Sequence, residues 1–289
     1  MLAKSFSLLL QHNGTVDGDC AIVNRVNSTP GIVVLWSQFD LVNAYFYTSQ
    51  CTLELVCSSP SFIDGGKYVF YPSLSNALFM NIRSLFAVYL NSRNSVLSSA
   101  LDIFVAKTDD ASTWNQLVRL TQVTGVDSVY DVDMCLDASG TTLGIVFNFN
   151  QSEVRAMVVL IDNITTSNLS GVFLPNQSTL DSRVAIAEPI IAHAQNSFIA
   201  VWQGSLVDSP QIFFSTYDMV ALTWSPRTPF GIPYLSYNST YSFASIASDY
   251  SFGRMWMVTY LSNFQGNYRV LSQGLFSPSP PFDFILFFF

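Results

Sequence analysis

Asn196-Ser-Phe-Ile-Ala-Val-Trp-Gln203 is the segment that most clearly indicates how this chain folds. A turn-forming Asn-Ser pair precedes a short apolar run of aromatic, β-branched and small residues. A run that is apolar at successive positions is typical of a β-strand whose two faces are both covered. The stretch therefore predicts a strand in the middle of a sheet that packs between two neighbouring sheets.

Four other runs have the same character, and each also ends on an aromatic residue. They are residues 31–36, 85–89, 143–147 and 255–260, which end on Trp36, Tyr89, Phe147 and Tyr260. Together with Trp202, these closing aromatics follow one another at steps of 53, 58, 55 and 58 residues. Self-similarity at a nearly constant step of this length indicates a repeat architecture.

Turn residues divide each repeat into three or four short strands, and no stretch has a convincing helical period. Four antiparallel strands in a repeat of roughly 40–60 residues are typical of a propeller blade. We therefore predict an all-β fold, a β-propeller of four-stranded antiparallel blades, with five blades favoured over six. The prediction is one domain over residues 1–289, with repeats at about 14–60, 66–122, 126–175, 183–230 and 238–289. In the first repeat, residues 51–56 are predicted as the fourth strand.

The composition argues against two classes of protein. The formal net charge is −8, and the 12 lysines and arginines form no cluster, which argues against nucleic-acid binding. Apolar residues make up 49% of the chain, but no apolar run approaches the roughly 18 residues of a membrane-spanning helix. The carboxylates are mostly Asp, which favours turns, so they fit a turn-rich β protein.

The four cysteines, at positions 20, 51, 57 and 135, include no CxxC pair, and the two histidines are far apart. The sequence therefore predicts neither a metal site nor a cofactor. Cys51 and Cys57 are close enough to form a small loop, but buried free thiols are an equal or better interpretation. Seven Asn-x-Ser/Thr sequons would permit glycosylation in a secretory pathway. There is no clear signal peptide, and we expect an extracellular or cell-surface protein.

The segment Lys107-Thr-Asp-Asp-Ala-Ser-Thr-Trp114 resembles the Asp-box of the sialidase-like (BNR repeat) β-propellers, whose pattern is Ser-x-Asp-x-Gly-x-Thr-Trp. Asp109, Thr113 and Trp114 match that pattern in place, whereas the Ser and Gly positions depart from it. Residues 215–224 are similar to a second, degenerate copy. Both segments fall between the predicted third and fourth strands of a repeat, where the family has the box. The resemblance implies that Asp109 bonds the backbone of a hairpin turn and that Trp114 fills the gap between strands.

The same resemblance implies a set of catalytic residues that this sequence lacks in part. Active sialidases carry an Arg-x-Pro near the first blade, two further arginines, a Tyr–Glu nucleophile pair and an acid/base Asp. Here Arg25 is not followed by that Pro, and Arg227-Thr-Pro229 comes after a Trp at the outer edge of a repeat. The chain has three glutamates, so few partners exist for a catalytic Tyr.

An alignment of the first strands of repeats two to five identifies candidate functional residues. Tyr71, Asp131, Glu188 and Phe243 take equivalent positions just before the strand. The first strand of a propeller blade lines the central channel, so these residues are expected around one mouth of it. Asp131 and Glu188 on adjacent blades are a potential acid and base of a glycosidase, with Arg183 nearby. Solvated carboxylates at a channel rim are the simpler interpretation.

Aromatic residues ahead of the fifth repeat are the second candidate set. Tyr237 and Tyr241, with Tyr71 and Phe243, are predicted to contact a ligand, because aromatic rings stack on sugars and on protein partners. Packing between blades is the simpler explanation for these rings. No calcium loop is present, since alternating ligands at the required spacing are missing.

These observations lead to three functional hypotheses. The favoured one is a non-catalytic, sialidase-like propeller that binds a glycan or a protein partner through one face of the ring. The first alternative is a sialidase-like exo-glycosidase that uses the carboxylates at the channel mouth. The second is an outer-membrane β-barrel, because Ile285, Phe287 and Phe289 alternate at the C-terminus.

Overall fold

The strands of this chain form five antiparallel sheets that follow one another along the sequence. The computed structural model describes residues 16–25, 31–39, 43–52, 54, 56–67, 80–81, 84–92, 100–110, 112–124, 127–137, 139–166, 172–182, 189–194, 196–206, 209–230, 239–248, 255–264, 267–276 and 285–287. Each sheet is built from consecutive strands, each hydrogen-bonded to the next, except that β17 of the fourth sheet pairs with β15. The predictions of an all-β fold and of antiparallel sheets are confirmed, and the strands form separate sheets rather than one continuous sheet.

The first two sheets contain β1 (Val16–Arg25), β2 (Gly31–Phe39), β3 (Asn43–Cys51) and β4 (Ser61–Lys67), then β5 (Met80–Asn81), β6 (Ser84–Asn91), β7 (Asp102–Thr108) and β8 (Asn115–Arg119). The third sheet contains β9 (Val129–Leu136), β10 (Thr142–Phe149), β11 (Glu153–Leu160) and β12 (Ser178–Asp181). The fourth contains β13 (Ile190–Ala194), β14 (Ser197–Leu206), β15 (Ser209–Asp218), β16 (Thr223–Trp224) and β17 (Thr228–Phe230). The fifth contains β18 (Ser239–Ser248), β19 (Met255–Phe264), β20 (Asn267–Phe276) and β21 (Ile285–Phe287).

The fourth strand of the first sheet differs from the prediction. It begins at Ser61, whereas Cys51 is the last residue of β3 and Thr52 N–H donates to the Val56 carbonyl at 3.0 Å in the connection that follows. Cys51 and Cys57 are joined by a disulfide, which closes the chain into a loop and prevents it from running on as a strand. Cys135, by contrast, is a buried free thiol, as the alternative interpretation of the cysteines proposed.

One short helix, α1 (Ile161–Thr166), interrupts the strands in the described part of the chain. It connects β11 to the segment that leads to β12. In the residues that the structure covers, no helix is long and apolar enough to cross a membrane.

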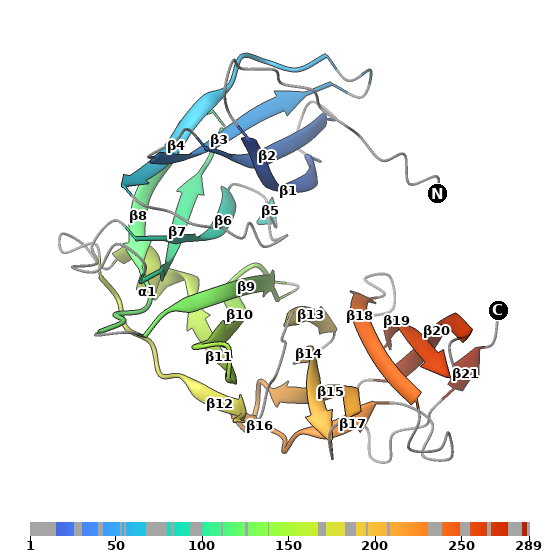
Figure 1. The fold of residues 1–289 in the computed structure, drawn as a ribbon. Helices are drawn as coiled ribbons and strands as arrows, with labels where there is room; N and C mark the ends of the chain where they lie inside the picture. The colour runs from blue at the N-terminus through green and yellow to red at the C-terminus, as the bar shows by residue number, and fades with distance from the viewer. Residues whose placement is uncertain are drawn as a thin grey trace.

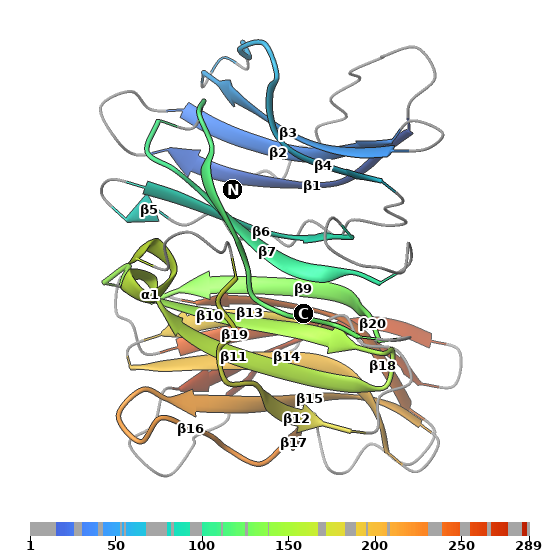
Figure 2. The same cartoon turned by 90° about the vertical axis from the view of Figure 1, so that its left-hand side faces the viewer.

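The five sheets lie in an arc around a common centre, with their first strands innermost (Figure 1). The first and fifth sheets are at the two ends of this arc. Turned by 90°, the structure shows α1 and β16 on the same side of the arc (left in Figure 2). Both elements follow the third strand of their sheet, so we name this side the α1 face. Because β9 and β11 run in the same direction, the start of β9 lies toward the opposite face.

Strand β14, which contains the opening stretch, is covered on both faces as predicted. Phe198, Ala200 and Trp202 pack in one apolar cluster with residues of the third sheet. The alternate residues Ile199 and Val201 pack in another cluster with the fifth sheet. Side chains on a strand alternate between its two faces, so a strand between two neighbouring sheets must be apolar at successive positions.

The closing aromatics of all five repeats fall on the second strand of their sheet, on β2, β6, β10, β14 and β19. Each is buried, with between 0% and 6% of its surface exposed. Tyr89 packs with Phe46 of the preceding sheet, with ring centroids 4.8 Å apart. These residues are therefore part of the packing between sheets.

Candidate functional site

Two aspartates lie on the innermost strand of the third sheet. Asp131 is half-buried near the start of β9, toward the face opposite α1. Asp133 accepts a hydrogen bond through Oδ2 from the backbone N–H of Ile191 on β13, at 2.9 Å. Residues two apart on a strand share a face, so Asp131 also faces the fourth sheet. Their Cα atoms are about 6–7 Å apart, because a strand rises about 3.3 Å per residue.

The other residues predicted for this channel mouth are described in part or not at all. Glu188, Arg183, Tyr71 and Tyr237 lie outside the described residues. Tyr241 and Phe243 are on β18, the innermost strand of the fifth sheet, and Phe243 falls where the pairing with β19 shifts register. Asp131 and Phe243 thus lie on the first strands of their sheets, whereas the alignment placed them just before these strands. Their position at a channel mouth and the pairing of Asp131 with Glu188 stay predictions.

The turn that resembles an Asp-box is organised by Asp110, whereas the prediction gave this role to Asp109. Oδ1 of Asp110 accepts hydrogen bonds from the backbone N–H groups of Ser112 and Thr113, at 2.8 and 2.7 Å. The Thr113 N–H is the main cause that lowers the pKa of Asp110 well below its usual range. The Asp109 side chain is 70% exposed and forms a surface ion pair with Lys107 at 3.4 Å.

The equivalent turn of the fourth sheet has the same geometry. Oδ1 of Asp218 accepts from the backbone N–H groups of Val220 and Ala221, at 2.7 and 3.0 Å, and these bonds lower its pKa. The aromatic residue after each turn is half-buried: Trp114 packs against the core shared by the first two sheets, and Trp224 lies 5.2 Å from the Tyr217 ring. In both turns the aspartate carboxylate accepts from the backbone N–H groups two and three residues later in the chain. These hydrogen bonds stabilise the reversal of chain direction.

The first sheet closes its third-to-fourth-strand turn with the disulfide instead of an aspartate. The flanking hydrogen bonds are nevertheless the same as in the fourth sheet. The hydroxyl of Ser49 donates to the Ser58 carbonyl at 2.7 Å, and that of Ser215 donates to the Ser225 carbonyl at 2.6 Å. These turns are equivalent parts of a repeat, and their role is structural.

Sequence reasoning missed a set of buried aspartates that join neighbouring sheets. Asp64 on β4 accepts hydrogen bonds through Oδ2 from the Tyr89 hydroxyl at 2.8 Å and from Asn91 Nδ2 at 2.9 Å, both on β6. In the same way Asp181 on β12 accepts through Oδ2 from Trp202 Nε1 on β14, at 3.0 Å. The bonds from Tyr89 and Trp202 each link the fourth strand of one sheet to the closing aromatic of the next.

A signal for these bonds is present in the sequence. Asp64 precedes Tyr89 by 25 residues, and Asp181 precedes Trp202 by 21 residues. Both closing aromatics carry a polar hydrogen that needs an acceptor when it is buried. Phe147, the closing aromatic of the third repeat, carries none and is fully buried among apolar side chains.

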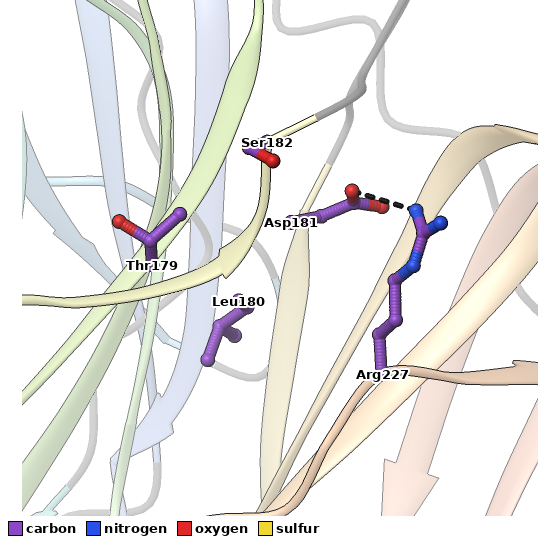
Figure 3. Close-up of a pocket in the computed structure, with 5 residues that line it drawn as sticks. All are labelled: Thr179, Leu180, Asp181, Ser182 and Arg227. Atoms are coloured by element: carbon purple, nitrogen blue, oxygen red, sulfur yellow. Dashed lines mark hydrogen bonds and ion pairs between the residues drawn. The ribbon is translucent and has the colours of Figure 1, made fainter.

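Asp181 also lines a cavity at the outer edge of the arc, between the third and fourth sheets. The cavity has a volume of about 410 Å³ and is lined by Thr179, Leu180, Asp181, Ser182 and Arg227. Figure 3 shows Arg227, from the segment before β17, extending toward Asp181 of β12. Arg227 Nη1 donates to Asp181 Oδ1 at 2.7 Å. We name this space the outer cavity.

Metal binding finds no support in the described part of the chain. There, no group of three His, Cys, Asp or Glu side chains is placed to hold a metal ion. Several carboxylates already have structural partners, including the buried Asp102, which accepts from Thr121 Oγ1 at 2.8 Å and from Arg119. Asp131 and Asp133 on β9 and the residues that line the outer cavity place further polar groups at the inner and outer edges of the third sheet.

Comparison with known proteins finds similarity at the level of structure. No protein-family model and no curated protein sequence matches this chain. The α-L-arabinofuranosidase Arb93A of Fusarium graminearum, solved with an iminosugar inhibitor, superposes with a TM-score of 0.59 at 11% identity, over 92% of this chain and 78% of that one. The α-L-arabinanase of Penicillium chrysogenum, solved with arabinobiose, gives a TM-score of 0.53 at 14% identity, over 84% of this chain and 71% of that one.

These neighbours are β-propeller glycosidases, and the likeness extends over most of this chain. At this level of identity the comparison concerns the fold and carries no residue roles with it. The arc of radially arranged antiparallel sheets is thus the architecture of a β-propeller of the kind found in glycoside hydrolases.

Proposed function

We propose that this chain is a glycan-recognising β-propeller with glycoside hydrolase activity, and that arabinofuranosyl-containing glycans are its substrate class. The observation that carries the proposal is the half-buried Asp131 on the innermost strand of a fold shared with arabinofuranosidase and arabinanase. The proposal replaces the non-catalytic hypothesis as the favoured one, because the likeness in structure is to glycosidases. The sialidase-like family stays an alternative affiliation, supported by the Asp110 and Asp218 turns.

The proposed chemistry needs two carboxyl groups on either side of a glycosidic bond. Asp131 supplies one of them, at the mouth of the central channel, on the side where the third and fourth sheets are neighbours. We assign the second carboxyl group to Glu188, with Arg183 as its neighbour. Glu188 is three positions before Ile191 in sequence, and the Ile191 N–H donates a hydrogen bond to Asp133. Asp133 takes a positioning role, since this bond holds β9 and β13 together. Tyr71, Tyr237, Tyr241 and Phe243 are proposed to contact the sugar.

The proposed architecture is one domain that carries five blades, which the five sheets of the described residues support. A six-bladed ring would need one more sheet between the first and the fifth. An extracellular or cell-surface location is part of the proposal, and the Cys51–Cys57 disulfide supports it, because disulfides persist in oxidising compartments.

The test is hydrolysis of 4-nitrophenyl α-L-arabinofuranoside, other aryl glycosides and linear arabinan by the purified chain. The expected result is turnover of an arabinofuranoside and a loss of about 10²–10⁴-fold in kcat/KM for Asp131→Asn, the range for removal of a general acid or base. Asp109→Asn is the matched control, since Asp109 lies on an exposed turn. Equal activity of Asp131→Asn and the unchanged chain would remove Asp131 from the mechanism.

A non-catalytic glycan-binding propeller is the second candidate. It is favoured by the number of aspartates that already hold turns or join sheets, such as Asp64, Asp110, Asp181 and Asp218. Binding of an arabino-oligosaccharide in calorimetry without release of product from any substrate would select this candidate over the hydrolase.

A further inference from the structure

We propose that the outer cavity is a second sugar-binding site, separate from the channel mouth, that takes a neutral, multiply hydroxylated sugar. The inference rests on the proposed function, because it assumes that the chain meets glycans. The outer cavity lies on the fourth strand of the third sheet and the segment before β17, whereas Asp131 is on an innermost first strand. The two sites are thus at opposite edges of the same pair of sheets.

The size and lining of the outer cavity suit a small polar ligand. Its volume of about 410 Å³ falls within the range of ligand pockets, about 300–1,000 Å³. Four of its five lining residues, Thr179, Asp181, Ser182 and Arg227, carry hydroxyl, carboxylate or guanidinium groups. Thr179 and Ser182 are exposed, so a ligand can reach their hydroxyls from solvent.

The charges in the outer cavity favour a neutral ligand over an ion. The Arg227 side chain is 30% exposed and that of Asp181 is 2% exposed, and the two form an ion pair at 2.7 Å. An anion would gain the attraction of Arg227 but would meet the buried carboxylate beside it. A cation would meet a carboxylate whose Oδ1 and Oδ2 already accept from Arg227 and Trp202. Hydroxyl groups, which both donate and accept, avoid both penalties.

Arg227 keeps donors for such hydroxyls. A guanidinium group has five N–H donors. Nη1 is used for Asp181, and the other N–H groups of Arg227 have no acceptor among the described residues. Vicinal hydroxyls of a sugar ring can accept from these donors while Thr179 and Ser182 contribute at the rim.

The site is also rigid. The Arg227 guanidinium lies over the Phe213 ring at 5.0 Å, and Phe213 stacks on Trp202 with centroids 6.4 Å apart. A Cβ at Gly204 would lie only 2.8 Å from the Phe213 ring and 3.2 Å from Asp181 Oδ2, so the absence of a side chain there permits this packing. A binding group that is already held in place loses little entropy when a ligand arrives.

Arg155 provides a matched control on the same pair of sheets. Its guanidinium lies over the Phe149 ring at 3.7 Å, and its Nε donates to Glu153 Oε2 at 2.7 Å. Arg155, like Arg227, therefore pairs with a carboxylate and lies over an aromatic ring. Unlike Arg227, it does not line the outer cavity.

The experiment is calorimetric titration of arabinobiose into the Asp131→Asn chain, in which the proposed chemistry is blocked and the sugar is not consumed. We expect two binding events, one of which is weakened at least tenfold by Arg227→Gln and unaffected by Arg155→Gln. Ser182→Trp fills the cavity while both members of the Asp181–Arg227 pair are retained, and it should remove the same event. Digalacturonate, an anionic sugar, should not bind at this site. Thermal melts of each variant report whether a loss reflects unfolding.

The outcomes separate this inference from the proposed function. A single binding event that survives both Arg227→Gln and Ser182→Trp overturns the second site and leaves the channel site standing. If Arg227→Gln and Ser182→Trp each lose one of the two binding events and keep the melting temperature of the unchanged chain, the second site is supported. Preferential binding of digalacturonate overturns the neutral ligand class, and no binding of either sugar overturns the second site together with the glycan assumption.

Discussion

The bond between Asp64 and Tyr89 makes the most direct prediction about what holds neighbouring sheets together. Asp64, Tyr89 and Asn91 are 4%, 2% and 4% exposed, so water cannot replace a lost partner easily. A hydrogen bond to a charged group contributes about 1.5–3 kcal/mol to stability. Tyr89→Phe removes the donor alone and should cost an amount in that range. Asp64→Ala removes the acceptor of both Tyr89 and Asn91, and it should cost about 3–5 kcal/mol.

The assay is urea unfolding of the two single variants and of the double variant. A double-mutant cycle isolates the coupling between the two side chains, which we expect to be about 1.5–3 kcal/mol. Tyr217→Phe is the control, because the half-buried Tyr217 hydroxyl has no hydrogen-bond partner among the described residues, and its loss should change stability by less than about 0.5 kcal/mol. A coupling energy below about 0.5 kcal/mol would refute the reasoning, since the two groups would then act independently.

Four further predictions concern turns and packing. Asp110→Ala should lower stability by about 1–2 kcal/mol, because it removes the acceptor of two backbone N–H groups. Asp109→Ala should have little effect, and urea unfolding of the two variants measures which aspartate stabilises the turn. Since the pKa of Asp110 is lowered in the folded chain, its contribution should be complete above about pH 4 and lost progressively as pH falls toward the folded pKa. The difference in stability between Asp110→Asn and the unchanged chain should therefore narrow from pH 6 to pH 2, and a constant difference over this range would contradict the prediction. Reduction of the Cys51–Cys57 disulfide should cost about 2 kcal/mol for so short a loop, and an unchanged melting temperature after reduction confirmed by mass shift would contradict this. Gly144→Ala should destabilise by about 1–3 kcal/mol, because the new Cβ would lie 2.8 Å from a buried phenylalanine ring, and a melting temperature equal to that of the unchanged chain would count against it.

The turn at residues 107–114 illustrates a limit of pattern matching. Two aspartates stand side by side, and the spacing of the family pattern selects Asp109. The hydrogen bonds select Asp110, because its carboxylate is the one that reaches N–H groups two and three residues ahead. A shift of one residue does not alter composition or periodicity, so the local backbone conformation alone decides which carboxylate is used.

The channel residues illustrate a different limit. The alignment of first strands gives Asp131 its place on an innermost strand, because strand order within a repeat follows from the chain. Which side chains of neighbouring sheets meet it depends on how the sheets pack. Similarly, Asp181 and Arg227 are 46 residues apart and meet because β12 and the segment before β17 lie at the edge of adjacent sheets.

The amino-acid sequence alone specifies a repeated antiparallel β structure whose second strands are covered on both faces. The physical reason is local: Asn196–Gln203 and its four relatives are apolar at successive positions, which is stable only between two sheets. The tertiary structure alone decided that Tyr89 and Trp202 are bound by Asp64 and Asp181, and that Arg227 borders a cavity. These contacts join residues of different sheets, and their distances depend on how the sheets pack around the centre of the arc.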